Sequence, residues 1–245
     1  MNLNHLNIVI ASLLVIMSCS KEVPSNNLVE RDGIKYEVNS QTPFSGTSLD
    51  LYTNGQYKEV LYYKKGIPHG QKERFYENGQ LASTGNYIEG NEDGSWQTYH
   101  ENGQLASTGN YIEGNEDGIW NRYDILGLKE HYEEGELKSK GNFKNGKRDG
   151  PWEFYSSYIV RLRKGNFKDG EKDGVWTTYF DDGQVDTITY KEGIFHGPNH
   201  RYRPDGTLGY LHNYSDGEQD GLQLFISSDG TRYKDCYKKG KKIDC

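Results

Sequence analysis

Hydrophobic and polar positions repeat along this chain with a period of about 24 residues. Each period closes on the motif Gly-x-x-[Asp/His]-Gly, and its second glycine is termed the anchor glycine below. The anchor glycines are Gly70, Gly94, Gly118, Gly150, Gly174, Gly197 and Gly221, and Gly46 opens the first unit. An aromatic residue stands seven positions before each closing glycine, and a large apolar residue stands five positions after each anchor. The closing motif, the aromatic residue before it and the apolar residue after it keep the same spacing throughout, so the sequence indicates a tandem repeat of eight units from residue 47.

Each unit has the alternation and the turn signals of a β-hairpin. In the unit 95–118 we predict a first strand over 96–100, an Asn-Gly turn at 102–103 and a second strand over 104–112. Asn-Gly is a strong hairpin signal because both residues tolerate positive φ. We expect the segment 114–118 to turn the chain into the next hairpin. The predicted fold class is therefore all-β, an elongated single-layer ribbon of tandem antiparallel β-hairpin repeats.

All four tryptophans occupy one phase of the repeat, two residues after an anchor glycine. A single-layer sheet has no second layer to cover it, so we predict that these rings form a packed aromatic stripe. Tyrosines five residues after the anchor join them as candidates for a binding surface. The candidates are Trp96, Trp120, Trp152, Trp176, Tyr99, Tyr123, Tyr155 and Tyr179. Since Trp96 and Tyr99 differ in strand parity, we expect a bulge or an edge position in the first strand, and Gly109 leaves room for a neighbouring ring.

Two adjoining units depart from the pattern. The unit 119–150 is eight residues longer than the others, with 125–135 inserted or duplicated. The unit 151–174 has 156–160 in place of its Asn-Gly turn. These departures indicate either a kink or partner site, or an ordinary surface insertion.

The first 18 residues carry no charged side chain and contain an apolar run over 8–17. Ten residues are too few to span a bilayer, which takes about 20, but they suit the hydrophobic region of a signal peptide. The run ends in Ile-Met-Ser-Cys19, which resembles a bacterial lipobox; the alternative is a buried strand with a stray cysteine. We therefore predict a lipoprotein signal peptide over 1–18, lipidation at Cys19, a polar tether over 19–27 and the repeat domain over 28–245.

Composition agrees with a small aromatic core. Only 33% of the 245 residues are hydrophobic, but 20 tyrosines and 4 tryptophans exceed what a disordered chain carries. The formal net charge is −7, which argues against binding nucleic acid because phosphate recognition needs a strong cationic face.

The unit W-x-x-Y-x-x-[ND]-G-[QTE]-[LV], followed by G-[NY]-[YF]-x-x-G-x-x-D-G, resembles the bacterial variant of the MORN repeat. The stretches 29–36 and 43–46 strengthen the match, so that the resemblance covers 28–245. Such proteins are often labelled as the YwqK-type antitoxin-component family. The resemblance implies a ribbon of antiparallel hairpins and a non-catalytic, interaction-type role, and it transfers no catalytic residue.

The sequence shows no enzyme signature. It lacks HExxH, GxSxG, Walker A and CxxC motifs, and adjacent acidic residues on a strand point to opposite faces. His69 and His196 fill the Asp position of the closing motif, where a turn role is expected. We predict neither a catalytic residue, nor a metal site, nor a cofactor.

Charge is unevenly distributed along the repeats. Residues 77–118 contain eight acidic side chains and no Lys or Arg, whereas 231–245 contain six basic and two acidic side chains. This pattern indicates either a solvated surface or docking steered by opposite charge.

Cys236 and Cys245 are the only cysteines besides Cys19. In an oxidising compartment such a pair is a disulfide candidate. If Gly240-Lys241 forms the last two-residue turn, Cys236 faces Cys245 as a non-hydrogen-bonded pair, with Cα atoms about 4.5 Å apart.

These observations lead to one preferred function and two alternatives. The preferred hypothesis is a lipid-anchored envelope protein, periplasmic or surface-exposed, that binds another macromolecule through its aromatic stripe and strand edges. One alternative is a toxin-neutralising antitoxin or immunity protein with a protein partner. The other is glycan or cell-wall binding, in which the repeated Trp and Tyr rings stack on sugars.

Replacing the predicted lipidation site should release the protein from membranes. In Cys19→Ser the predicted mature chain keeps no other apolar segment, so membrane fractions washed with high salt should lose it. A variant that still sediments with washed membranes would show that the anchor lies elsewhere.

Overall fold

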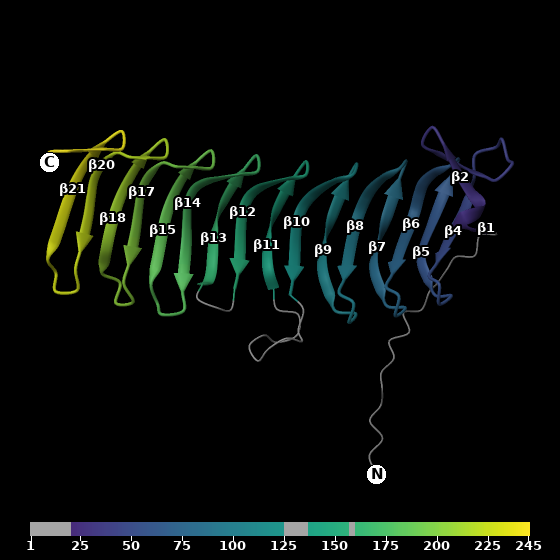
Figure 1. Cartoon of the computed structure of the whole chain (residues 1–245), viewed down its shortest axis with the longest axis horizontal. Helices are drawn as coiled ribbons and strands as arrows, with labels where there is room; N and C mark the ends of the chain where they lie inside the picture. Colours follow the sequence, from purple (N-terminus) through teal and green to yellow (C-terminus); the bar gives the residue numbers. More distant parts are fainter. Residues whose placement is uncertain (1–20, 125–136, 157–159) are drawn as a thin grey trace, which may run out of the picture.

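The protein is an open ribbon of β-strands in a computed structural model that describes residues 21–124, 137–156 and 160–245. The described strands stand side by side along the long axis of the molecule (Figure 1). Twenty of them form one sheet, in which all pairings are antiparallel except that of β1 with β4, and the remaining two form a small hairpin. The predicted fold class is confirmed. The predicted signal peptide, Cys19, the whole of 125–135 and residues 157–159 lie outside the described residues.

The bounds of the elements follow the repeat. The N-terminal elements are β1 (Glu22–Pro24), η1 (Ser25–Asn27), β2 (Leu28–Arg31) and β3 (Ile34–Glu37). The ribbon continues with β4 (Gly46–Leu51), β5 (Tyr57–Lys64), β6 (Ile67–Phe75), β7 (Leu81–Ile88), β8 (Asn91–Tyr99), β9 (Leu105–Ile112), β10 (Asn115–Tyr123) and β11 (Leu137–Lys144). It proceeds through β12 (Lys147–Tyr155), β13 (Val160–Lys168), β14 (Glu171–Phe180), β15 (Val185–Lys191), β16 (Ile194–Phe195) and β17 (Gly197–Tyr202). The last strands are β18 (Leu208–Ser215), β19 (Glu218–Gln219), β20 (Gly221–Ile226), β21 (Arg232–Lys238) and β22 (Lys241–Ile243).

Residues that we predicted to be a tether form a strand at the N-terminal end of the sheet. The tether prediction over 19–27 is wrong from residue 22 onward, because β1 pairs parallel with β4. Val23 is buried and packs in a cluster with Phe44, Leu61 and Tyr63. Val23 is enough to hold β1 against the sheet, because the strand is also paired to β4 through its backbone.

Two kinds of connection alternate along the ribbon. The first is a two-residue turn in which both residues have positive φ, such as Glu113 at 49° and Gly114 at 79°. These angles match the right-handed twist of the flanking strands. The prediction of a turn over 114–118 is therefore wrong: the turn takes 113–114, and Asn115–Tyr123 is one continuous strand.

The second connection is a three-residue loop that contains the Asn-Gly dipeptide. In the loop after β8, His100 N–H donates to the Gln104 carbonyl oxygen at 2.8 Å, and Gly103 N–H donates to the His100 carbonyl oxygen. The Asn102 side-chain oxygen accepts from Gln104 N–H at 3.0 Å. Only Gly103 has positive φ, 85°, so Asn-Gly ends a type I turn instead of forming a two-residue turn.

The anchor glycines lie inside strands, where they form bulges. In β10 the register moves from Asp117 opposite Asn110 to Asn121 opposite Thr108, and Gly118 within this interval has a φ of 68°. Positive φ is accessible to glycine at no steric cost. The first strand does contain a bulge, but it lies at the anchor glycine before the tryptophan and not between Trp96 and Tyr99, where their difference in parity had predicted it.

Alternation along the strands then defines two faces of the sheet. The tryptophan face carries Trp96, Trp120, Trp152 and Trp176, and each pairs laterally with a glycine or an isoleucine of the next strand. The opposite asparagine face carries Asn86, Asn110, Asn142 and Asn166, which neighbour those glycines in sequence.

Backbone hydrogen bonds join each two-residue turn to the hairpin before it. The N–H of the turn glycine donates to the carbonyl oxygen of the residue two positions before an anchor glycine, at 2.6–3.0 Å. The described pairs are Gly66–Phe44, Gly90–Pro68, Gly114–Glu92, Gly146–Glu116, Gly170–Arg148, Gly193–Lys172, Gly217–Phe195 and Gly240–Gln219. Each hairpin is thus held by its predecessor, as in other repeat arrays.

The structure places Cys236 and Cys245 in a disulfide, with Cα atoms 5.2 Å apart. The turn that we predicted for this hairpin is displaced by one residue, so the predicted strand register is wrong by two residues. The turn is Lys239-Gly240, both with positive φ, so that Cys236 faces Ile243 and the bridge reaches two residues past it. Turn glycines take the second position in this repeat, and the prediction placed Gly240 first.

The disulfide should be present in protein that has passed through an oxidising compartment. Alkylation without reductant should then modify neither Cys236 nor Cys245, and intact mass should change by two alkyl groups only after reduction. The closed loop of about ten residues is worth about 3 kcal/mol in the chain-entropy model, so reduction should also lower the melting temperature. Two thiols alkylated without reductant would contradict the bridge.

Candidate interaction surfaces

The tryptophan side chains are core residues of this single-layer sheet. Their exposed fractions are 8% for Trp96, 4% for Trp120 and 2% each for Trp152 and Trp176. Each indole N–H donates to the backbone carbonyl of the residue ten positions earlier, at 2.9–3.3 Å. The sheet itself therefore buries the apolar surface of each indole and supplies the acceptor for its N–H.

Each indole lies directly on a glycine of the preceding strand. A Cβ at Gly85, Gly109, Gly141 or Gly165 would lie 2.0–2.4 Å from ring atoms of the tryptophan eleven residues later. Only glycine leaves room for this approach, which confirms the expectation for Gly109.

Where a unit lacks the tryptophan, it also lacks this glycine. Asn199 stands at the tryptophan position with Ile188 eleven residues earlier, and Gln223 stands there with His212. Both polar side chains are buried, and Gln223 Nε2 donates to the Asn213 carbonyl oxygen at 2.9 Å. This bond replaces the indole N–H bond at Gln223, whereas Asn199 Oδ1 accepts from Thr189 N–H at 2.9 Å.

The aromatic residues seven positions before the anchors alternate with the tryptophans. Successive rings meet edge to face, with centroids 5.0–6.4 Å apart. In order along the ribbon the rings are Tyr87, Trp96, Tyr111, Trp120, Phe143, Trp152, Phe167 and Trp176. Edge-to-face pairs add stabilisation beyond the buried area.

The predicted stripe of eight candidates is divided between the two faces. Tyr99, Tyr123, Tyr155 and Tyr179 are half-buried and do not belong to the tryptophan cluster. Tyr99 Oη donates to Gln97 Oε1 at 2.9 Å, and Tyr155 Oη donates to Glu153, both on the asparagine face. No extra residue interrupts β8 between Trp96 and Tyr99, so their odd separation puts the two side chains on opposite faces. The extra residue at the loop end of the β8–β9 strand pair is Ala106, which lies in β9.

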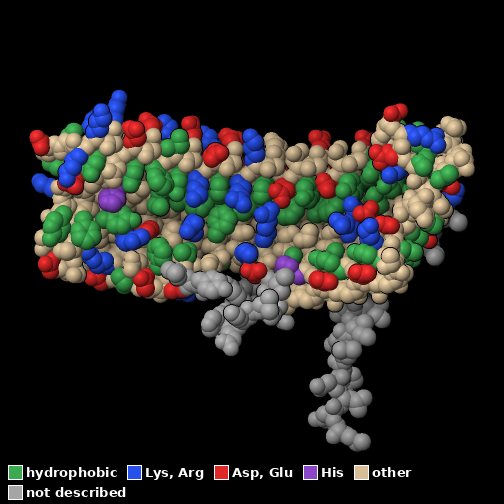
Figure 2. All heavy atoms as spheres, viewed as in Figure 1, with side chains coloured by type: hydrophobic (Ala, Val, Ile, Leu, Met, Phe, Trp, Pro, Cys, Tyr) green, Lys and Arg blue, Asp and Glu red, His purple; other side chains and the backbone are tan. Residues whose placement is uncertain are grey.

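Four charged residues form a column along the tryptophan face, two positions before successive anchor glycines. This charge column consists of Glu92, Glu116, Arg148 and Lys172. Figure 2 shows a green band of hydrophobic side chains along this face, with blue side chains over β12 and β14 and red ones over β8 and β10. The backbone carbonyl of every member accepts the turn hydrogen bond described above.

The two cations of the charge column lie over aromatic rings. The Arg148 guanidinium carbon is 4.6 Å from the Trp152 ring centroid, and Lys172 Nζ is 4.7 Å from that of Trp176. Burial lowers the pKa of Arg148, and repulsion from Arg122 lowers it further. Burial and then the charge of Arg163 lower the pKa of Lys172.

The acidic half of the column differs in its partners. Glu116 accepts from Arg122 at 3.2 Å, and Glu92 accepts from the Tyr87 hydroxyl at 3.2 Å. Burial, followed by the charge of Glu92, raises the pKa of Tyr87 to about 12. Within the described ranges, neither Arg148 nor Lys172 has a carboxylate within ion-pair distance.

The asparagine face carries a row of exposed apolar residues one position after the anchor glycines. This apolar row consists of Ile119, Pro151, Val175, Pro198 and Leu222. Ile119 is 66% exposed, Val175 53% and Leu222 39%. In the first units the same position is polar, with Gln71 and Ser95.

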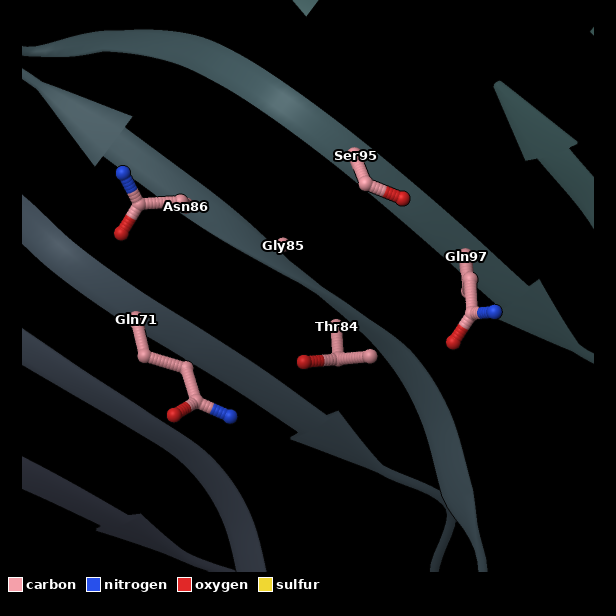
Figure 3. Close-up of a pocket in the computed structure, with 6 residues that line it drawn as sticks. All are labelled: Gln71, Thr84, Gly85, Asn86, Ser95 and Gln97. Atoms are coloured by element: carbon pink, nitrogen blue, oxygen red, sulfur yellow. The ribbon is translucent and has the colours of Figure 1, made fainter. Parts of the chain in front are cut away.

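Beyond the polar end of this row the asparagine face has a shallow depression. Gln71, Thr84, Asn86, Ser95 and Gln97 surround Gly85 there (Figure 3). It lies on the opposite side of the sheet from the Trp96 ring that packs on Gly85. Its lining offers amides and hydroxyls and no titratable group.

The described part of the chain brings no metal-binding cluster together. Among those residues, no three His, Cys, Asp or Glu side chains lie close enough to share an ion. His196 Nδ1 lies 3.3 Å from Asp216, and His200 contacts Thr187 instead. None of the helices in residues 21–124, 137–156 and 160–245 is long and apolar enough to cross a membrane.

A comparison with protein families matches the hairpin units. Four segments match the MORN repeat variant: 68–89, 92–113, 128–145 and 172–192. Three of these segments begin at the position of the charge column and end within the next two-residue turn, so one MORN repeat is a strand, a three-residue loop and a strand. MORN repeats generally mediate binding or scaffolding and are generally non-enzymatic.

The matched MORN segments are shorter than the resemblance over 28–245 that we expected. The hairpin ribbon nevertheless continues through the unmatched segments 193–245 and 46–67 with the same turns. No curated protein matches the chain. Neither the charge column nor the apolar row was predicted above, although each is visible in the sequence when the same position of every unit is compared.

The contact between indole and glycine should appear as an energetic coupling. Gly109→Ala should destabilise the protein by about 1–3 kcal/mol, because its Cβ overlaps Trp120. Trp120→Gln should cost about 3–5 kcal/mol but keep the bond to the Asn110 carbonyl oxygen, as Gln223 does at its own position. In the double variant the alanine should cost at least about 1 kcal/mol less than it does alone, measured by urea unfolding. Additive costs would show that Gly109 serves another purpose.

Proposed function

We propose that this protein is a non-catalytic scaffold of the bacterial cell envelope, anchored through a lipid on Cys19, that binds another protein on its asparagine face. The observation that carries the proposal is the apolar row Ile119, Pro151, Val175, Pro198 and Leu222. The lipobox-like sequence before Cys19 supports the anchor. The proposed contact surface differs from the aromatic stripe favoured by the sequence, because the tryptophan rings are buried.

The geometry of the apolar row suits a protein partner. Its members recur on every second strand, and this places them about 10 Å apart along the ribbon. On the intervening strands they pair with Asn142, Asn166, Thr189 and Asn213, so apolar and hydrogen-bonding side chains alternate. A regular row of exposed apolar side chains gathers apolar surface on one face, and gathered apolar surface marks an interaction site more often than isolated side chains do.

Charge around the row indicates an acidic partner. Residues 137–172 contain ten Lys and Arg and four Asp and Glu, a local net charge of +6 over both faces. Three of these cations, Arg148, Arg163 and Lys172, lie on the tryptophan face. Lys144, Lys147, Lys168 and Lys191 are exposed beside the two-residue turns on the asparagine face. Cationic side chains around an apolar centre steer and orient an acidic protein surface.

The non-catalytic part of the proposal rests on the family and on the surfaces. MORN repeats are generally non-enzymatic. The polar depression around Gly85 offers no acid, base or nucleophile with a shifted pKa. Stacking of sugars on the tryptophans is disfavoured because the rings are at most 8% exposed.

The test is affinity capture of the anchored protein from its own envelope, followed by mass spectrometry, with three baits. The baits are the wild type, the row variant Ile119→Asp with Val175→Asp, and the matched variant Ile88→Asp with Ile112→Asp. All four side chains are exposed on the asparagine face, so none of these changes opens a cavity.

The proposal expects an acidic protein to be captured by the wild type and by the matched variant and lost with the row variant. A toxin in that role would make the protein an immunity protein. Retention on peptidoglycan by all three baits, without a protein partner, would contradict protein docking and favour glycan binding. Equal capture by all three baits would place the contact elsewhere.

A further inference from the structure

We propose that two copies of this chain pair through their tryptophan faces, in opposite directions along the ribbon and related by a two-fold axis. The surface that carries the inference is the charge column Glu92, Glu116, Arg148 and Lys172 with the aromatic cluster beside it. This pairing uses the face opposite the apolar row, so it does not depend on the proposed protein docking.

The order of charges in the column is self-complementary. Its members lie on β8, β10, β12 and β14, which places β11 at the centre. We place a two-fold axis in the interface, parallel to the strands and passing over β11. Rotation about this axis reverses the direction of the ribbon and lays the charge column of one copy over the charge column of the other. Glu92 of one copy then faces Lys172 of the other, and Glu116 faces Arg148. An isologous interface requires this relation between the two halves of a surface.

Both cations gain from such a pairing. Arg148 and Lys172 are half-buried against aromatic rings, and other cations lower their pKa further. A carboxylate of the second copy would bring a counter-charge within ion-pair distance, which the described residues of their own copy do not. Glu116 keeps its bond to Arg122 and has acceptor positions left for Arg148 of the second copy.

The remaining positions near the centre of the face avoid like charges. Across the same axis, Arg122 on β10 faces Phe154 on β12, Arg163 on β13 faces Ser107 on β9, and Thr98 faces Thr178. Farther out, Arg74 faces Arg201. Each of these is already paired in its own copy, Arg74 with Glu59 at 3.9 Å and Arg201 with Asp186 at 2.6 Å.

The aromatic cluster supplies apolar area along the same line. Tyr87, Tyr111, Phe154 and Tyr190 are only partly buried against the tryptophans, and no second layer of described residues covers them. A second copy would cover these rings while it pairs the charges. An unrelated acidic partner would satisfy Arg148 and Lys172 but would leave Glu92 facing like charge.

Charge reversal distinguishes this pairing from other contacts. The variant Glu92→Lys with Glu116→Lys makes the column wholly positive, and Arg148→Glu with Lys172→Glu makes it wholly negative. The variant with all four changes restores a self-complementary order of opposite sense. Folding should survive, because the native column already places glutamate and lysine beside tryptophan rings. The control is Lys144→Glu with Lys168→Glu on the asparagine face.

Analytical ultracentrifugation of the full chain in non-ionic detergent at low ionic strength provides the measurement. Wild type, control and fourfold variant should sediment as dimers, each double variant should be monomeric, and an equimolar mixture of the two double variants should form a mixed dimer. In 1 M salt, where the Debye length is about 3 Å, wild-type association should weaken at least about tenfold.

Three results would overturn the proposal. One is a wild type that stays monomeric at the highest concentration reached. Another is a pair of double variants that dimerise as well as the wild type does. The third is a fourfold variant that remains monomeric although its unfolding curve matches that of the wild type.

Discussion

The packing of an indole on a bare glycine backbone is the interaction on which the rest of this ribbon depends. A single-layer sheet cannot bury side chains between two layers, so it must bury them along its own surface. A flat ring laid on Gly109 brings Trp120 close to the backbone, and the same ring donates to the Asn110 carbonyl oxygen. The bulge at Gly118 directs the ring toward that strand. Each contact joins neighbouring strands, and stability accumulates along the array.

This way of building a core determines which residues remain available for binding. The tryptophans and the rings between them are committed to the sheet, although flat aromatic side chains at regular spacing suggest a ligand platform. The repeat leaves other positions unconstrained, and Glu92 and Arg148 occupy equivalent sites in different units. Ser95 and Ile119 likewise share one site on the other face. The contacts that we propose therefore use positions that vary from unit to unit.

The sequence was sufficient to predict the repeat, its hairpins, the space above Gly109 and the pairing of Cys236 with Cys245, because each depends on periodicity or chain distance. It misassigned the turns because Gly114 and Gly118 both adopt positive φ, one in a turn and one in a bulge. Residue type does not distinguish these uses; hydrogen bonding does. The polar stretch around Val23 gave no strand signal, since β1 is held by backbone pairing. The prediction grouped Tyr99 with the tryptophans, although it lies on the other face. Whether the unpaired residue of this strand pair lies in β8 or in β9, as Ala106 does, depends on the geometry of the loop between the strands.

The near-identical units also explain why the charge column is informative. The segments 77–94 and 101–118 have the same sequence, so Glu92 and Glu116 are copies of one residue. Continued copying would give a column of one sign, and two such faces would repel each other. The next two described units carry Arg148 and Lys172 at this position while they keep the tryptophan, the glycine and the turn. Folding requires no change of sign there, because the backbone bonds of all four units are alike. The reversal also changes the charge presented to whatever approaches the face, and its symmetry about β11 fits the pairing with a second copy that we propose.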